Sequence, residues 1–92
     1  MTTEIDVSRK EWVSATVLAS LLTATRNYGH APKRSIMESS NLPFPLFDDY
    51  FQYMLSNGFV QMKETPYENL YYLTEKGHKT LNNFERSILN PF

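Results

Sequence analysis

Apolar residues recur along most of the chain with the spacing of helices. The run Trp12–Ala24 is apolar on more than one face, which predicts a helix that is buried on more than one side. Gly29 and Pro32 interrupt the pattern, and proline is well tolerated in the first turn of a helix. We therefore expect a second helix over residues 32–40, with its apolar side chains facing a core.

The C-terminal half changes its periodicity twice. A third helix is expected over residues 45–57, and Gly58 is a typical residue just past a helix end. Residues 59–63 and 70–73 are rich in apolar and aromatic residues around a turn-like segment, which predicts a β-hairpin. Thr74 can cap a last helix. Three apolar residues at helical spacing mark its buried face: Leu81, Phe84 and Ile88.

Length and composition predict a single packed domain. The chain has 92 residues, of which 41% are hydrophobic and 14% aromatic. We expect the domain over residues 8–92, after a flexible tail over residues 1–7 that shows no periodicity. The absence of cysteine excludes disulfides and zinc-thiolate sites. No segment resembles a signal peptide or a membrane span, so we expect a cytoplasmic protein without membrane contact.

Two segments resemble a known family. Asn41–Val60, NLPFPLFDDYFQYMLSNGFV, is similar to the turn, recognition helix and first wing strand of small archaeal winged-helix regulators, which include chromatin-type DNA-binding proteins. Tyr72–Gly77, YLTEKG, resembles the segment that ends the wing and begins the last helix in many such regulators. The resemblance implies an α+β, mostly α-helical winged helix-turn-helix fold, with a three-helix core, a β-hairpin wing and a C-terminal helix.

The same resemblance implies a transcription regulator that binds double-stranded DNA as a homodimer. The apolar residues that exceed the needs of one core mark the expected dimer interface: Trp12, Leu81, Phe84 and Ile88. At the wing tip, Tyr67 and Asn69 are candidates for contact with a DNA groove. An aromatic residue beside a proline more often fixes a loop, and we favour this interpretation of Tyr67.

Basic residues lie outside the expected recognition helix. Arg26, Lys33 and Arg34 follow one another without an intervening acid, and Lys63 lies near the wing. These four are the candidate contacts to the DNA backbone, with an ordinary solvated surface as the alternative. The expected surface of the third helix contains two acids and no base; its candidate residues are Phe44, Asp48, Asp49, Gln52 and Tyr53.

The charge pattern keeps two other functions open. The formal net charge is −1, whereas a DNA-binding domain usually has a surplus of positive charge. A protein–protein interaction module on the same fold, with weak or no DNA binding, is therefore one alternative. A regulator that responds to a ligand in an apolar pocket at the dimer interface is the other.

No set of residues indicates catalysis or metal binding. His30 and His78 lie far apart in the sequence, and no nucleotide-binding or metal-binding motif is present. Asp48 and Asp49 are adjacent, and neighbouring side chains on a helix point about 100° apart, so they do not converge on one substrate atom. We therefore expect no enzymatic activity, no cofactor and no metal.

Overall fold

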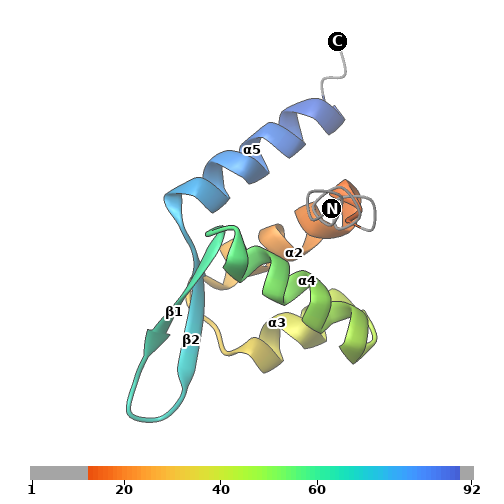
Figure 1. Ribbon diagram of the computed structural model, residues 1–92. Coiled ribbons are helices and arrows are strands. Elements are labelled where there is room, and N and C mark those ends of the chain that lie inside the picture. Colours follow the sequence, from red (N-terminus) through yellow and green to blue (C-terminus); the bar gives the residue numbers. More distant parts are fainter. Residues whose placement is uncertain (1–12, 90–92) are drawn as a thin grey trace, which may run out of the picture.

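The computed structural model describes residues 13–89, which form helices and one β-hairpin (Figure 1). The elements in chain order are α2 (Ala15–Tyr28), α3 (Lys33–Ser40), α4 (Phe44–Ser56), β1 (Val60–Glu64), β2 (Asn69–Leu73) and α5 (Glu75–Leu89). This order, with a two-stranded antiparallel hairpin between the last two helices, confirms the predicted winged helix-turn-helix architecture. The expected tail over residues 1–7 and the side chain of Trp12 lie outside the described residues.

The first described helix begins at Ala15 and not at the start of the apolar run. Ser14 has extended backbone angles, and its hydroxyl accepts a hydrogen bond from the Val17 amide at 3.3 Å, as expected of an N-cap. The Ser14 amide donates to the Tyr50 hydroxyl at 2.8 Å. Because Tyr50 is buried in α4, this bond fixes the start of α2 against the third helix of the core.

Helix α2 continues past the end of the apolar run at Ala24 and stops at the break that Gly29 predicts. The helix continues to Tyr28, since Thr25 is fully buried and its hydroxyl donates to the Leu21 carbonyl at 2.8 Å. A polar residue in the run therefore does not end the helix, because the helix backbone satisfies its hydroxyl. Gly29 ends it with φ of 80°, a conformation that glycine adopts without a steric penalty.

The turn between α3 and α4 brings these two helices together at an angle, as in a helix-turn-helix unit. Asn41 makes the reversal in the left-handed conformation, with φ of 60°. Pro43 precedes α4 with extended backbone angles, and Pro45 occupies the first turn. The expected boundaries of α3 and α4 are confirmed to within one residue at each end.

The hairpin is tied to the helices by a backbone bridge. Its strands pair from Val60 with Leu73 to Glu64 with Asn69. The Ala31 amide donates to the Tyr71 carbonyl at 3.1 Å, and the Tyr71 amide donates to the Ala31 carbonyl at 2.7 Å. Ala31 is buried between α2 and α3, so the bridge fixes the wing relative to the start of α3.

The core lies where α2, α4 and α5 meet the hairpin (Figure 1). Its fully or almost fully buried members include Leu18, Leu21, Leu22, Ile36, Phe47, Phe51, Met54, Val60 and Leu81. The bulk of these side chains means that the core depends on aliphatic and aromatic packing from every helix. Among the described residues, no buried side-chain nitrogen or oxygen lacks a hydrogen bond.

Gly77 allows the last helix to approach the hairpin closely. A Cβ atom at this position would collide with the Phe59 carbonyl oxygen and would lie 2.9 Å from Leu73 Cγ. The Thr74 hydroxyl accepts from the Gly77 amide at 3.0 Å, which confirms the predicted cap. The Thr74 cap and the lack of a side chain at Gly77 together fix the position of the first turn of α5.

Replacing Gly77 with alanine should lower the free energy of unfolding by about 2 kcal/mol, because the added methyl group meets backbone atoms that cannot yield. Asn82→Ala, at an exposed position of the same helix, is the matched control and should be close to neutral. Urea unfolding followed by circular dichroism measures both. Equal stability of Gly77→Ala and the wild type would contradict the close packing described for this helix.

Candidate nucleic-acid interface

The start of α3 is held against α4 by Lys33. Its ammonium Nζ lies 2.7 Å from the carboxylate Oδ1 of Asp48, and 5.0 Å and 5.8 Å from the ring centroids of Phe51 and Phe44. The cation is therefore shared between a carboxylate and the faces of two aromatic rings. Two predicted site residues, Asp48 and Phe44, are thereby brought next to a third, Lys33.

The next residue connects α3 to the wing. Arg34 Nη2 lies 3.9 Å from Glu68 Oε1 in the loop between the strands, and the backbone bridge between Ala31 and Tyr71 lies at the base of the same contact. The start of α3, the start of α4 and the wing loop therefore share one face of the molecule. We call the surface formed by Lys33, Arg34, Phe44 and the loop 65–68 the α3–wing face.

Two other candidate backbone contacts lie elsewhere. Arg26 Nη1 pairs with Glu85 Oε2 at 3.2 Å, which is a contact between α2 and α5. Arg26 is close to Lys33 and Arg34 in the sequence, but this ion pair holds its side chain away from theirs. The break at Gly29 redirects the chain between them. Lys63 is exposed on β1, and within residues 13–89 it makes no ion pair.

Acidic partners neutralise three of the four candidate backbone contacts. Arg26, Lys33 and Arg34 each pair with a carboxylate that is distant in sequence. The side chains in the two pairs of the α3–wing face are between one third and two thirds exposed. Pairs with this exposure are weak in water, because solvent screens both charges. Sequence reasoning missed them because no local pattern connects residues that only the tertiary fold brings together.

The aromatic residues of α4 divide between the core and the surface. Phe47, Tyr50 and Phe51 are buried in the core, whereas 57% of Phe44 is exposed. Tyr53 is half-buried and its ring packs against Phe59, so it contributes little to an exposed patch. Of the two aromatic candidates on this helix, Phe44 is therefore the one that presents a largely exposed ring.

The remaining candidates on α4 differ in solvent exposure and in whether they form an ion pair. Asp49 and Gln52 are exposed to solvent. Asp48 is about one third exposed, and its carboxylate is occupied by Lys33. The outer surface of α4 therefore presents an aromatic ring near its start, the amide of Gln52 and the carboxylate of Asp49, for which residues 13–89 provide no ion pair.

The wing tip is formed by Pro66 and Tyr67. Tyr67 is 94% exposed, so the interpretation that its ring fixes the loop is wrong. Thr65 holds the loop instead, because its hydroxyl accepts from the amides of Tyr67 at 3.3 Å and Glu68 at 3.1 Å. Asn69 is not at the tip, since it pairs with Glu64 as the first residue of β2.

The candidates for a dimer interface are only partly on the surface. Leu81 has no exposed area and belongs to the core of its own protomer, so it offers no surface to a partner. Phe84 is half-buried and packs against that core from α5. The side chains of Trp12 and Ile88 lie outside the described part of the chain.

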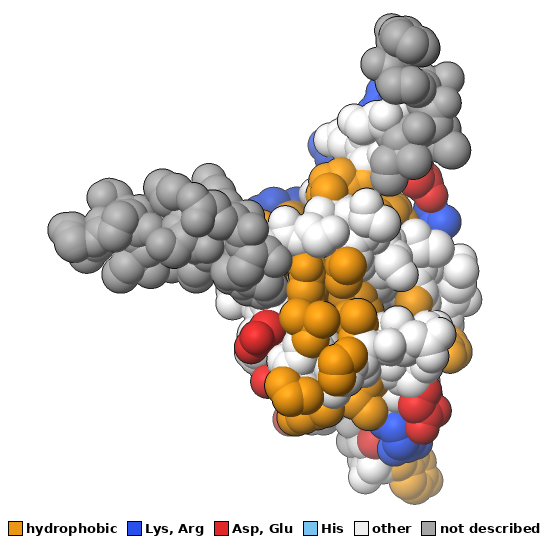
Figure 2. All heavy atoms as spheres, turned by 90° about the vertical axis from the view of Figure 1, so that its right-hand side faces the viewer, with side chains coloured by type: hydrophobic (Ala, Val, Ile, Leu, Met, Phe, Trp, Pro, Cys, Tyr) orange, Lys and Arg blue, Asp and Glu red, His pale blue; other side chains and the backbone are white. Residues whose placement is uncertain are grey.

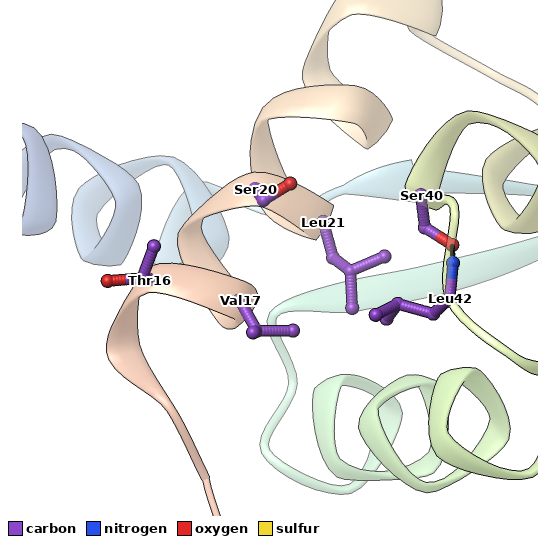
Figure 3. Close-up of a pocket in the computed structure, with 6 residues that line it drawn as sticks. All are labelled: Thr16, Val17, Ser20, Leu21, Ser40 and Leu42. Atoms are coloured by element: carbon purple, nitrogen blue, oxygen red, sulfur yellow. Dashed lines mark hydrogen bonds between the residues drawn. The ribbon is translucent and has the colours of Figure 1, made fainter.

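A shallow hollow of about 200 Å³ lies between the first half of α2 and the end of α3 (Figure 3). Its lining residues are Thr16, Val17, Ser20, Leu21, Ser40 and Leu42. In Figure 3, Val17, Leu21 and Leu42 point toward one another, while the side chains of Thr16 and Ser20 lie at the margin. The hollow is partly open to solvent and no charged residue lines it, so it lacks the full enclosure and the orienting charge of a typical effector site.

Two further searches cover the described residues. Over residues 13–89, no group of three or more histidine or acidic side chains is placed to hold a metal ion. None of the helices in this part of the chain is long and apolar enough to cross a membrane.

Comparison with known proteins identifies the family. A family model described as "Winged helix-turn-helix" matches residues 13–90. No curated protein matches the sequence.

Solved structures show the same fold at low sequence identity. SSV1 F-93 superposes with a TM-score of 0.67 at 21% identity, covering 78% of this chain and 81% of its own. The type III plasmid segregation protein TubR gives 0.63 at 17%, covering 73% and 70%. The PcaV transcriptional regulator from Streptomyces coelicolor, solved with its natural ligand, gives 0.65 at 16%, covering 87% and 63%.

A double-mutant cycle on Lys33→Met and Asp48→Asn should give a coupling free energy of about 0.5–1 kcal/mol, which falls as salt is raised, because both side chains are one third exposed. The cycle Arg26→Met with Glu85→Gln, on a pair of similar exposure, is the control. Urea unfolding at low and high salt measures both. A coupling above about 2 kcal/mol that persists in high salt would show that Lys33 is locked in place.

Proposed function

This chain belongs to the winged helix-turn-helix family, and we propose that it regulates transcription by binding double-stranded DNA through the α3–wing face. One observation carries the proposal. The fold places Lys33 and Arg34 at the start of α3, beside an exposed wing tip that carries Tyr67. In winged-helix proteins, a helix-turn-helix unit and a neighbouring wing are the elements that contact the duplex.

The ion pairs on this face are compatible with phosphate binding. Lys33 and Arg34 are paired with carboxylates in the protein alone, and both pairs are open to solvent. A DNA phosphate can therefore replace Asp48 or Glu68 as the partner of the cation, and the displaced carboxylate is hydrated again. Since the exchange starts from an existing pair, each contact contributes less affinity than an unpaired lysine would.

The net charge of −1 is a total for the whole chain, whereas the charge that DNA meets is local. On the α3–wing face, Lys33 and Arg34 each have one carboxylate partner that a phosphate can replace. With Lys33 and Arg34 on the α3–wing face and Lys63 on strand β1 of the wing as backbone contacts, about three phosphates are neutralised per protomer. The logarithm of the binding constant should then fall with the logarithm of salt with a slope of about −3 per protomer.

We propose that the protein acts as a homodimer and that α5 contributes the interface. Figure 1 shows the C-terminal half of α5 pointing away from the hairpin, and Glu85 in this half pairs with Arg26 of α2. Phe84 lies in this half and is only half-buried in its own protomer. A second copy of α5 could bury its remaining surface. Such a dimer would present two α3–wing faces to one duplex.

A protein partner is the second candidate function. It is favoured by Phe44, which exposes more than half of its area, and by the exposed carboxylate of Asp49 one turn later. An apolar residue beside an acid suits a basic, amphipathic segment of another protein. In that case α4 would bind a partner with equal strength in the presence and absence of DNA.

Lys33→Glu with Arg34→Glu should abolish binding to short random-sequence duplex DNA, because it replaces two phosphate contacts by repulsion. Glu68→Gln should act in the opposite direction and strengthen binding at low salt, since it releases Arg34 from its acidic partner. Fluorescence anisotropy across a salt series measures all three proteins.

The control for these variants carries the same change of charge elsewhere. Lys79→Glu with Arg86→Glu alters two exposed residues of α5 and should bind DNA nearly as the wild type does, apart from a weak long-range effect. If both double variants lose binding equally, the effect is one of total charge, and the α3–wing face is not the contact surface.

Phe84→Ser should shift the protein from dimer to monomer, because it removes the largest half-buried apolar side chain described on α5. Asn82→Ser, on the exposed side of the same helix, should leave the oligomeric state unchanged. Multi-angle light scattering over a concentration series reads the mass of each, with circular dichroism to verify folding. A folded Phe84→Ser protein that remains a dimer would place the interface elsewhere.

A further inference from the structure

The first turn of α4 is unusually apolar for a helix proposed to face DNA. Phe44 is 57% exposed, Leu46 is 39% exposed, and Pro45 between them is also on the surface. Figure 2 looks onto the end of the molecule where α4 begins and shows hydrophobic side chains gathered in a band across it. Three consecutive exposed apolar residues need a physical explanation, because they cost solubility without contributing to the core.

The same helix is poor in hydrogen-bond donors. It contains no lysine, arginine or asparagine, and prolines at positions 43 and 45 remove two backbone N–H groups at its start. The side-chain donors on its exposed surface are Gln52 and Ser56, which both lie in its second half. The beginning of α4 can therefore offer apolar contact and, at Asp49, a hydrogen-bond acceptor.

These properties limit which bases the start of α4 can recognise. Guanine presents two acceptors in the major groove and is usually read by the paired donors of arginine or lysine, which α4 lacks. Thymine presents a C5-methyl group, which apolar side chains such as phenylalanine contact. Of the distinctive groups in the groove, the thymine methyl is the one that matches an exposed phenylalanine.

Phe44 is also placed on the correct side of α4. Its ring centroid lies 5.8 Å from the ammonium group of Lys33, so the ring and the cation belong to the same face. A phosphate bound by Lys33 would set the backbone of the duplex beside Phe44, whose ring is 57% exposed. Apolar contact and phosphate contact are thus continuous across α3 and α4.

We propose that Phe44 reads the C5-methyl groups of thymine in the major groove, so that the protein prefers duplexes that carry methylated pyrimidines. This inference rests on the proposed DNA-binding function and adds a base preference to it. It predicts that recognition depends on a methyl group and not on the pairing of the base. A methyl group on cytosine occupies the same place in the groove and should be bound in the same way.

Two matched pairs of short duplexes test this directly. One pair alternates adenine with either thymine or uracil, and the other alternates guanine with either cytosine or 5-methylcytosine. The protein should bind the methylated member of each pair more tightly, by about fourfold for each methyl group that Phe44 buries. Anisotropy titrations at several salt concentrations measure the ratio, and the salt slope should be the same within a pair.

Phe44→Ala should remove the preference for methylated duplexes and keep the salt slope, because Lys33 and Arg34 remain. Tyr28→Ala, which removes an exposed aromatic ring at the end of α2, is the control and should keep the preference. A preference that survives in a folded Phe44→Ala protein would arise from the shape of the DNA, and the proposed contact would be wrong.

Two further outcomes separate this inference from the function on which it rests. Equal binding within both pairs, with a steep salt dependence, would overturn the methyl contact and leave DNA binding intact. No binding to any duplex at low salt would overturn both. If Phe44→Ala changes the molecular mass in light scattering and has no effect on DNA binding, the apolar turn is a contact between copies of the protein.

Discussion

The backbone bridge between Ala31 and Tyr71 determines how the helices and the wing are placed relative to each other. Its two hydrogen bonds, of 2.7 and 3.1 Å, attach β2 to the connection between α2 and α3. Tyr71 then packs edge-on against Phe51 in α4, so the bridge also joins the hairpin to the core. Because Lys33 and Arg34 follow Ala31 directly, the same bridge positions the basic residues beside the wing.

The ion pairs on that surface explain how a protein of near-neutral charge can serve as a DNA-binding regulator. Asp48 and Glu68 neutralise Lys33 and Arg34 in the protein alone, and both pairs are exposed enough to be exchanged for phosphate. Affinity from the backbone should consequently be modest and sensitive to salt. In the proposed mode of binding, the base preference comes from α4, whose first turn offers an apolar surface in place of donors.

Much of the fold could be predicted from the sequence, since its signals are local. Gly29, Pro32 and Gly58 mark helix boundaries, and Thr74 and Gly77 define the start of α5. The arrangement of the site could not be predicted in the same way. Arg26 forms an ion pair with Glu85 of α5, Leu81 is buried in the core of its own protomer, and Tyr67 is exposed at the wing tip. Each of these outcomes depends on long-range packing, which a local pattern does not encode.

The most direct measurement of the central claim is an NMR titration of the isotope-labelled protein with a short random-sequence duplex at low salt. Side-chain carboxylate and backbone amide resonances should both be followed. Carboxylate shifts at Asp48 and Glu68, with amide shifts at Lys33, Arg34 and Phe44, would show that phosphate displaces the acidic partners on the α3–wing face. Unchanged resonances there, with shifts confined to α2 and α5 or absent, would contradict the proposed mode of binding.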